Sequence, residues 1–322
     1  MKIVVSGATG FLGGHLCRRL VELGHDVVGL GRDAVKGALL GVPFEAVDLG
    51  ATGRLAGVDQ ADAFVHCAAL SSNWGRRADF ERANVTGTHN ALAMAQKLGV
   101  RRFVHISSPS VTFRFCDQLN LREDSALPRP VNAYAATKQH AEAIVRERTG
   151  VPAIILRPRG LYGPGDTALL PRLLRAARSG PLPLIHHGDT VIDLTYIDDA
   201  VNAMVLALGA ATMCDGRTYH ISGGEALRIR DVAVLSAQAA GIAVRFTGIP
   251  ASLAMAAARL AELAANLTPG RPEPLFTAYS VGLMAYSQTL DIDAARRDLG
   301  YVPQVSFAEG LRRTFLPGPA LS

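Results

Sequence analysis

The sequence predicts an α/β fold in which a doubly wound parallel sheet carries a smaller C-terminal lobe. In the first half, short apolar runs rich in β-formers alternate with longer helical patterns, which is typical of βαβ units. After Arg157 the pattern changes to segments punctuated by Pro and Gly. With 322 residues, 49% of them hydrophobic, the chain can bury a large core. We expect a sheet domain of residues 1–167 and 190–225, and a substrate-binding lobe of residues 168–189 and 226–322.

Seven apolar runs bounded by turn residues predict the strands, in the order Lys2–Ser6, Asp26–Leu30, Phe44–Val47, Ala63–His66, Phe103–Ser107, Ala153–Leu156 and Tyr219–Ser222. The clearest helical patterns between them are Phe11–Leu23, Arg77–Leu98 and Asn132–Thr149. Right-handed βαβ connections place a ligand at the carboxyl ends of such strands. We therefore look for the functional site in the segments that follow each strand.

One further stretch, Ala251–Leu267, predicts an amphipathic helix that is interrupted by Arg259 and Glu262. Such a helix can lie on a membrane surface, but the polar face of this one carries no basic cluster. We therefore favour a helix that packs over a substrate pocket.

Composition and charge exclude several classes of protein. The 33 basic residues behind the net charge of +5 are spread along the chain, so we expect no nucleic-acid partner. No apolar run reaches the ~18 residues of a membrane span, and the first run is too short for a signal peptide, which predicts a cytoplasmic protein. Four cysteines without zinc-ligand spacing predict reduced thiols and no metal site.

A glycine-rich turn, Gly7-Ala8-Thr9-Gly10-Phe11-Leu12-Gly13, joins the first strand to the first helix. The order strand, turn, helix aims the amides of a helix N-terminus at a pyrophosphate, which predicts a dinucleotide site. The spacing GxxGxxG resembles the short-chain dehydrogenase/reductase superfamily, and Thr-Gly-Phe-Leu-Gly resembles its extended branch. The resemblance implies a Rossmann fold and contacts from the turn to the cofactor by Gly7, Thr9, Gly10, Phe11, Leu12 and Gly13.

The end of the second strand indicates which dinucleotide binds. NAD enzymes place a carboxylate there to bind the ribose 2′-hydroxyl, whereas this chain has Gly31 followed by Arg32. A guanidinium can bind a 2′-phosphate with two hydrogen bonds, so NADP(H) is favoured. NAD(H) stays open because Asp33 follows one residue later. The resemblance adds further cofactor contacts at the ends of other strands, namely Asp48, Leu49, Ala68, Ala69, Ser107 and Pro158.

Tyr134 and Lys138 stand four residues apart, on one face of a predicted helix. A lysine ammonium beside a phenol stabilises the phenolate and lowers its pKa, which makes the phenol a usable acid/base. The resemblance gives these two residues the catalytic role and directs Lys138 to the nicotinamide ribose. It also assigns Ser108 as the hydroxyl that positions the substrate oxygen. Ser107 is the alternative, because adjacent residues of a strand point to opposite faces.

Asn84-Val85-Thr86-Gly87-Thr88 matches a helix segment of the extended branch in which the Asn supports the active-site strand. We therefore interpret Asn84 as structural.

The substrate class rests on a departure from a family pattern. Extended enzymes that act on nucleotide-sugars commonly carry an arginine four residues before the position of Tyr196, where this chain has Ile192. A substrate diphosphate beside isoleucine would be left unpaired, which is costly. Other arginines, Arg159, Arg172 or Arg271, could replace it.

Further motifs resemble the 3β-hydroxysteroid-dehydrogenase-like branch, which includes the bacterial 2-alkyl-3-oxoalkanoate reductases. They are Ser108–Thr112, Tyr134–Lys138, Arg157–Arg159 with Gly163–Asp166, and Ala294–Pro303. The resemblance implies an NADP(H)-dependent oxidoreductase for a hydrophobic 3-oxo or 3-hydroxy substrate, either steroid-like or a 2-alkyl-3-oxo acid. It also implies substrate contacts from Trp74, Arg159 and Tyr162. It also suggests a homodimer through the helices Arg77–Leu98 and Asn132–Thr149.

Two other functions stay open. One is a nucleotide-sugar epimerase, dehydratase or reductase of the same extended family. The other is a non-catalytic NADP-sensing regulator, which the Tyr134–Lys138 pair argues against.

Overall fold

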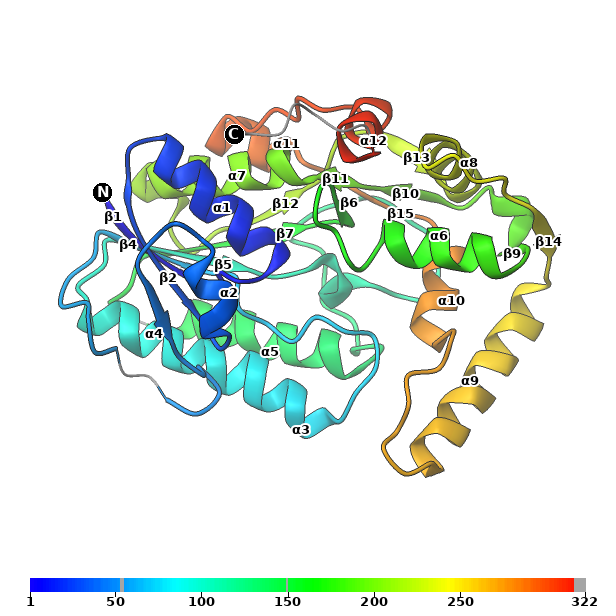
Figure 1. Cartoon of the computed structure of the whole chain (residues 1–322), viewed down its shortest axis with the longest axis horizontal. Coiled ribbons are helices and arrows are strands. Elements are labelled where there is room, and N and C mark those ends of the chain that lie inside the picture. The colour runs from blue at the N-terminus through cyan, green and yellow to red at the C-terminus, as the bar shows by residue number, and fades with distance from the viewer. Residues whose placement is uncertain (53–54, 149, 316–322) are drawn as a thin grey trace.

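A computed structural model describes residues 1–52, 55–148 and 150–315 of the chain (Figure 1). Its centre is a parallel sheet with the strand order β12-β7-β5-β4-β1-β2-β3. The strands are β1 (Lys2–Ser6), β2 (Asp26–Gly31), β3 (Phe44–Ala46), β4 (Ala63–His66), β5 (Arg102–Ile106), β7 (Ala153–Pro158) and β12 (Thr218–Ile221). All seven strands that the sequence predicts are therefore members of this one sheet, which confirms the predicted fold class.

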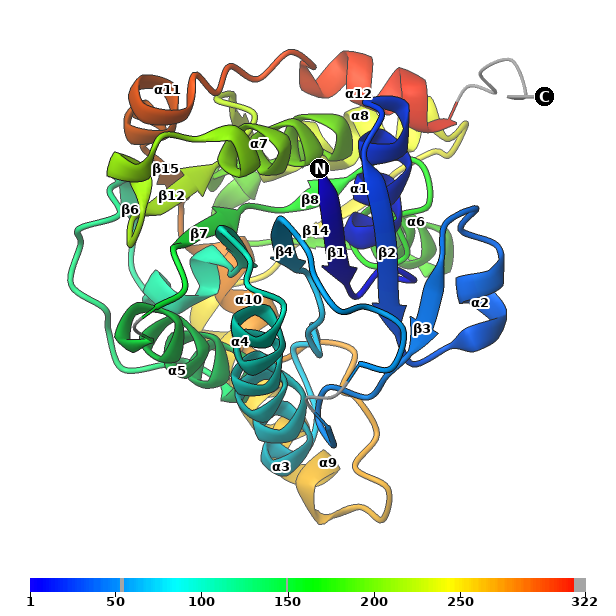
Figure 2. The same ribbon diagram turned by 90° about the vertical axis from the view of Figure 1, so that its left-hand side faces the viewer.

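Helices cover both faces of the sheet. Figure 2 shows α1 (Phe11–Glu22), α7 (Ile197–Gly209) and α11 (Asp293–Leu299) above it, and α4 (Gly87–Lys97) and α5 (Ala133–Glu147) below it. Successive side chains of a strand point to opposite faces, and β1 shows this directly. Ile3 and Val5 belong to the hydrophobic cluster on one side, whereas Val4 belongs to the cluster on the other. Burial on both faces explains why the strands read as continuous apolar runs.

The predicted helix Arg77–Leu98 is not a single α-helix. The structure divides it into α3 (Arg77–Phe80), the π-helical turn η1 (Glu81–Thr86) and α4. Asn84 lies in this turn, where its amide accepts a hydrogen bond from the Leu70 N–H at 2.7 Å and donates to Thr137 Oγ1 at 3.0 Å. These contacts explain the wider turn, because they draw Asn84 toward the loop after β4 and toward α5. Asn84 is structural, as the sequence predicts, but its contacts go to the loop after β4 and to α5 rather than to the active-site strand.

The predicted helix Asn132–Thr149 forms as α5. Asn132 caps it by accepting a hydrogen bond from the Ala135 N–H at 2.8 Å. Residue 149, the predicted end, lies outside the described residues.

The elements outside the main sheet are short. A four-stranded sheet has the order β13-β10-β15-β6, and two pairs of strands, β8 with β11 and β9 with β14, lie apart from it. These strands are β6 (Gln118–Leu121), β8 (Leu161–Tyr162), β9 (Leu182–Leu184), β10 (Val191–Asp193), β11 (Thr195–Tyr196), β13 (Ala226–Arg228), β14 (Phe246–Gly248) and β15 (Gln288–Leu290). The sequence did not predict these strands.

The remaining helices are α2 (Ala34–Ala38), α6 (Leu170–Ser179), α8 (Ile229–Ala239), α9 (Ala251–Leu267), α10 (Ala278–Ala285) and α12 (Phe307–Phe315). Short 3₁₀ turns are η2 (Pro109–Thr112), η3 (His186–Gly188) and η4 (Thr212–Cys214). Helix α9 has the predicted bounds and projects from the body of the molecule (Figure 1). It buries only Ala258 and Ala265. Among the described residues, no helix is long and apolar enough to cross a membrane.

Candidate active site

In the glycine turn after β1, Gly7 and Gly13 occupy positions where only glycine fits. Gly7 has φ +71°, and a Cβ there would lie 2.7 Å from the Ala68 nitrogen. A Cβ at Gly13 would lie 2.2 Å from the Gly7 carbonyl oxygen. Helix α1 begins after Gly10 without a side-chain cap, so its first N–H groups are open to a ligand. This arrangement fits the pyrophosphate of a dinucleotide.

The other residues predicted for the turn lie around it. Thr9, Phe11 and Leu12 are half-buried, and a Cβ at Gly31 would lie 3.0 Å from Thr9 Oγ1. At the end of β4, Ala68 is half-buried and Ala69 is exposed. The structure therefore brings the ends of β1, β2 and β4 together at the turn.

His15 is a residue that the sequence analysis missed. Its Nε2 lies 2.9 Å from the Pro164 carbonyl oxygen, which ties α1 to the loop after β8.

At the end of β2, Arg32 and Asp33 have different surroundings. Arg32 is exposed. Asp33 caps α2 by accepting a hydrogen bond from the Lys36 N–H at 3.0 Å, and its other oxygen lies 3.7 Å from Lys36 Nζ. The carboxylate that could bind a ribose 2′-hydroxyl is therefore engaged within the protein.

The two residues predicted to contact adenine also differ. Asp48 accepts hydrogen bonds from the Gly50 N–H at 3.0 Å and from Arg82 at 3.2 Å, whereas Leu49 is buried in the core. Arg82 is thus a further charged residue at this end of the sheet, contributed by the π-helical turn η1.

Tyr134 lies on the first turn of α5, half-buried and 6.4 Å from the ring of Phe80. Burial raises the pKa of Tyr134, and the neighbouring Ser71 and Ser108 act in the opposite direction. The structure therefore brings Tyr134 and Ser108 together, as predicted. Among the described residues Ser107 Oγ is buried without a hydrogen-bond partner, and it lowers the pKa of Glu142 rather than that of Tyr134, which favours Ser108 over the alternative. Ser71 was missed, because an isolated serine in a loop carries no sequence signal.

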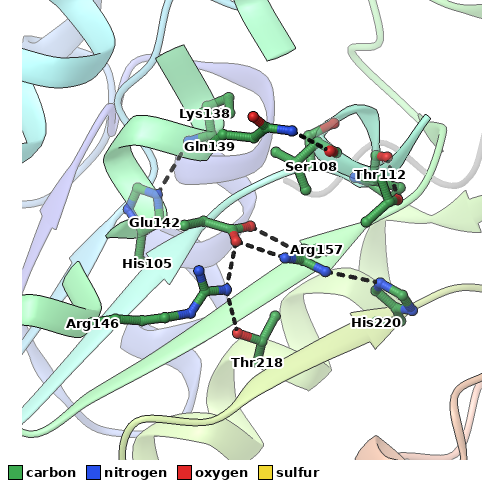
Figure 3. Close-up of polar contacts among 12 residues, drawn as sticks. His105, Ser108, Thr112, Lys138, Gln139, Glu142, Arg146, Arg157, Thr218 and His220 are labelled. Atoms are coloured by element: carbon green, nitrogen blue, oxygen red, sulfur yellow. Dashed lines mark hydrogen bonds and ion pairs between the residues drawn. The ribbon is translucent and has the colours of Figure 1, made fainter. Parts of the chain in front are cut away.

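Lys138 is buried. Its Nζ donates a hydrogen bond to the Ile106 carbonyl at 2.6 Å and lies 3.4 Å from His105 Nε2 (Figure 3). Burial lowers the pKa of Lys138 to about 8, and the charge of Glu142 opposes this shift. The expectation that Lys138 lowers the pKa of Tyr134 is not met, because the ammonium is directed at β5 and the pKa of Tyr134 is raised.

Glu142 continues the same helical face one turn beyond Lys138. It is fully buried and accepts two hydrogen bonds of 2.7 Å from Arg157 and one of 2.6 Å from Arg146 (Figure 3). Burial alone would raise the pKa of Glu142, but Arg157 lowers it below its usual value. Arg157 also lies 3.4 Å from His220 Nε2. The sequence analysis missed this cluster, although the spacing of Glu142 from Lys138 was readable.

Buried histidines lie beneath the site. His66 Nδ1 lies 2.7 Å from Ser6 Oγ, its Nε2 lies 3.1 Å from Thr88 Oγ1, and its ring stacks on His105. Burial lowers the pKa of His66 to about 3 and that of His220 to about 4, and it lowers that of His105 as well. These rings are therefore neutral in the folded protein.

The three predicted substrate contacts have different outcomes. Tyr162 is 1% exposed and packs against Tyr196 and Phe307, so the prediction that it contacts substrate is wrong. Trp74 donates its indole N–H to the Arg271 carbonyl at 3.0 Å, which links it to the loop between α9 and α10. Arg159 directly follows β7 and is 8% exposed. Pro158, the last residue of β7 and a predicted cofactor contact, is half-buried.

The geometry agrees with comparisons to known proteins. Residues 3–222 match the model of the NAD dependent epimerase/dehydratase family. The chain belongs to this family. Membership of this family shows that the protein is an NAD(P)-dependent enzyme of the extended short-chain dehydrogenases/reductases. The similarity of the chain to named reductases and dehydrogenases shows that it is an oxidoreductase.

Individual members of the epimerase/dehydratase family are similar over nearly the whole chain. The 2-alkyl-3-oxoalkanoate reductase of Stenotrophomonas maltophilia is 37% identical, over 97% of this chain and 98% of the relative. The 3beta-hydroxysteroid-dehydrogenase/decarboxylase isoform 1 of Arabidopsis thaliana is 30% identical, over 97% and 78%. The crystal structure of UDP-glucuronic acid 4-epimerase from Bacillus cereus in complex with NAD is 25% identical, with a TM-score of 0.75 over 98% and 97%.

Proposed function

We propose that this enzyme interconverts a ketone and a secondary alcohol on a hydrophobic 3-oxo or 3-hydroxy substrate and uses NADP(H). The observation that carries the proposal is the meeting of Tyr134 and Ser108 next to β5, in the sheet whose neighbouring strands end at the glycine turn. The similarity to an enzyme named 2-alkyl-3-oxoalkanoate reductase supports this substrate class.

The proposed chemistry divides between the cofactor and three side chains. The bound dinucleotide supplies or accepts the hydride. Ser108 donates a hydrogen bond to the substrate oxygen, and Tyr134 donates its proton to that oxygen during reduction. The raised pKa of Tyr134 keeps the phenol protonated before reduction begins. Lys138 is left to hold the nicotinamide ribose, as the family resemblance implies, because its ammonium does not lower the pKa of Tyr134.

The residues at the end of β2 are the basis of the proposed preference for NADP(H). Arg32 is exposed there and free to bind a 2′-phosphate, whereas the Asp33 carboxylate caps α2. A 2′-phosphate would form a charge-assisted hydrogen bond with Arg32, whereas a 2′-hydroxyl would have to compete with the Lys36 N–H for the Asp33 carboxylate.

One other function is supported by a specific observation, the similarity in fold to a UDP-glucuronic acid 4-epimerase. A nucleotide-sugar enzyme must bind a diphosphate. In this chain Ile192 takes the place of the family's arginine, and Arg172 is already paired with Glu273 at 3.0 and 3.1 Å. These two positions favour the ketone/alcohol reaction.

The test is to measure NADPH oxidation with 3-oxo acids and steroid ketones, and product formation with nucleotide-sugars, with wild-type enzyme and with Tyr134→Phe. We expect turnover of a hydrophobic 3-oxo substrate and a loss of at least about 100-fold in Tyr134→Phe, with unchanged NADPH affinity. Tyr286→Phe is the matched control, because this half-buried tyrosine packs on Phe115. Normal turnover by Tyr134→Phe would contradict the proposal, and conversion of nucleotide-sugars alone would support the epimerase function.

A further inference from the structure

Arg159 is a buried cation without an anionic partner. Among the described residues, no carboxylate oxygen lies within 4.0 Å of its guanidinium, and its side-chain hydrogen bond goes to the neutral amide oxygen of Gln288. Arg157, two residues earlier, is also buried but is held by both oxygens of Glu142. A buried charge is costly unless an opposite charge or several hydrogen bonds compensate for it. Arg159 therefore has capacity for an anion that the protein itself does not supply.

Asp193 does not fill this role. It acts on Arg159 electrostatically, but its Oδ2 accepts a hydrogen bond from the Leu290 N–H at 2.6 Å. Burial raises the pKa of Asp193 and lowers that of Arg159, so neither group is fully compensated by the other.

Arg159 and Ser108 follow the ends of neighbouring strands, because β7 and β5 are paired with Leu156 opposite Ile106. Tyr279, on α10, is influenced by the charge of Arg159 and also by Tyr134, so its phenol lies within electrostatic range of both. A chain of hydrogen bonds also runs from Arg159 through Gln288 and Gln118 to the Thr112 carbonyl, at the end of the turn that Ser108 caps. The neighbouring strand ends, Tyr279 and this chain of hydrogen bonds thus connect the unpaired cation with the region of Tyr134 and Ser108.

Most donors of the guanidinium are not used by the part of the protein that the structure describes. A guanidinium has five N–H donors, and the side-chain contact with Gln288 uses one nitrogen.

We propose that Arg159, assisted by the hydroxyl of Tyr279, binds a carboxylate of the substrate while Tyr134 and Ser108 hold its ketone oxygen. The substrate is then a 3-oxo acid rather than a neutral ketone, an assignment that rests on the proposed function. In a 3-oxo acid one carbon separates the carboxyl group from the ketone carbon. A single ligand can therefore present its carboxylate to Arg159 and its ketone oxygen to Tyr134 and Ser108. Burial raises the pKa of Tyr279 to about 12, so its hydroxyl stays protonated and can donate.

The test compares a 3-oxo acid with its methyl ester, which keeps the ketone and the alkyl chain but removes the charge. Arg159→Met keeps the apolar stem and removes the unpaired cation, so it should fold. We expect KM for the acid to rise about 10- to 100-fold in this variant, the effect of one charge-assisted pair, while KM for the ester stays within about twofold. Arg159→Lys should recover part of the lost affinity, and Tyr279→Phe should give a smaller rise.

Arg172→Met is the matched control, because Arg172 is exposed and already paired with Glu273. Its KM values for acid and ester should stay at the wild-type level. Equal shifts for acid and ester in Arg159→Met, or no shift for either, would overturn the carboxylate site.

A binding measurement separates this inference from the proposed function. Trp74 is the single tryptophan of the chain, and its fluorescence in the NADP⁺ complex, which cannot reduce a ketone, reports binding without turnover. If the acid binds wild-type protein at least about tenfold more tightly than Arg159→Met but is not reduced, the carboxylate site stands and the proposed reaction fails. If both proteins bind the acid equally, or if Arg159→Met loses affinity for a UDP-sugar alone, the carboxylate site fails.

Discussion

The carboxylate of Glu142 and the guanidinium of Arg157 form a buried pair joined by two hydrogen bonds of 2.7 Å (Figure 3). The pair links α5 to β7, and Glu142 lies one helical turn from Lys138. Its negative charge raises the pKa of Lys138 against the effect of burial. The same contact therefore attaches the helix that carries Tyr134 to the sheet and favours the charged form of its lysine.

Loss of Glu142 should strongly destabilise the protein. Glu142→Ala leaves Arg157 buried without its counter-charge, which typically lowers the free energy of unfolding by about 3–5 kcal/mol. Urea denaturation followed by circular dichroism measures this change. Asp124→Ala is the control, because the pair of Asp124 with Arg122 is exposed, with side-chain exposures of 73% and 68%, and should contribute far less. Similar losses in both variants would contradict the role of the buried pair.

Stability should fall in mild acid. The folded pKa values of His66 and His220 are about 3 and 4, below the unfolded value of about 6.5, so the unfolded chain binds more protons as pH drops. The free energy of unfolding should be level near pH 7 and fall below pH 6.5, by about 2 kcal/mol for each buried histidine at pH 5. Urea titrations at several pH values measure the slope. His66→Gln should make the slope shallower, whereas the exposed His140→Gln should not change it. An unchanged slope in His66→Gln would count against this assignment.

Gly13 of the glycine turn should tolerate no side chain. Gly13→Ala places a Cβ against the Gly7 carbonyl and should shift the turn, so we expect NADPH affinity to fall by at least about tenfold. Isothermal titration calorimetry measures it. Gly209→Ala is the matched control in another helix, since a Cβ there meets nothing within 4 Å. NADPH affinity that is retained by Gly13→Ala would show that the turn does not bind the pyrophosphate.

Arg32 should discriminate between the two dinucleotides. Arg32→Ala should weaken NADPH binding about 10- to 100-fold, the loss of one charge-assisted pair, and leave NADH binding almost unchanged. Lys36→Ala, one turn further along α2, should leave both affinities near the wild-type values. Parallel losses for NADPH and NADH in Arg32→Ala would assign Arg32 a structural role instead.

Much of the fold could be predicted because its signals are local. Each strand of the main sheet is a contiguous apolar run, and the glycine turn and the pair Tyr134 and Lys138 have fixed spacing along the chain. The short strands of the second half could not be predicted. Ile192 pairs with Gln288 in a register that depends on segments almost a hundred residues apart.

The sequence by itself determined the α/β fold, the glycine turn and the helix with its Tyr-Lys pair, since these depend on neighbouring residues and on backbone sterics. Only the tertiary structure decided how charges are compensated. It pairs Arg157 with Glu142, leaves Arg159 without a carboxylate and turns Lys138 toward Ile106, although all three basic side chains are buried. The reason is physical, because the energy of a buried charge depends on which groups from distant segments lie within a few ångströms of it.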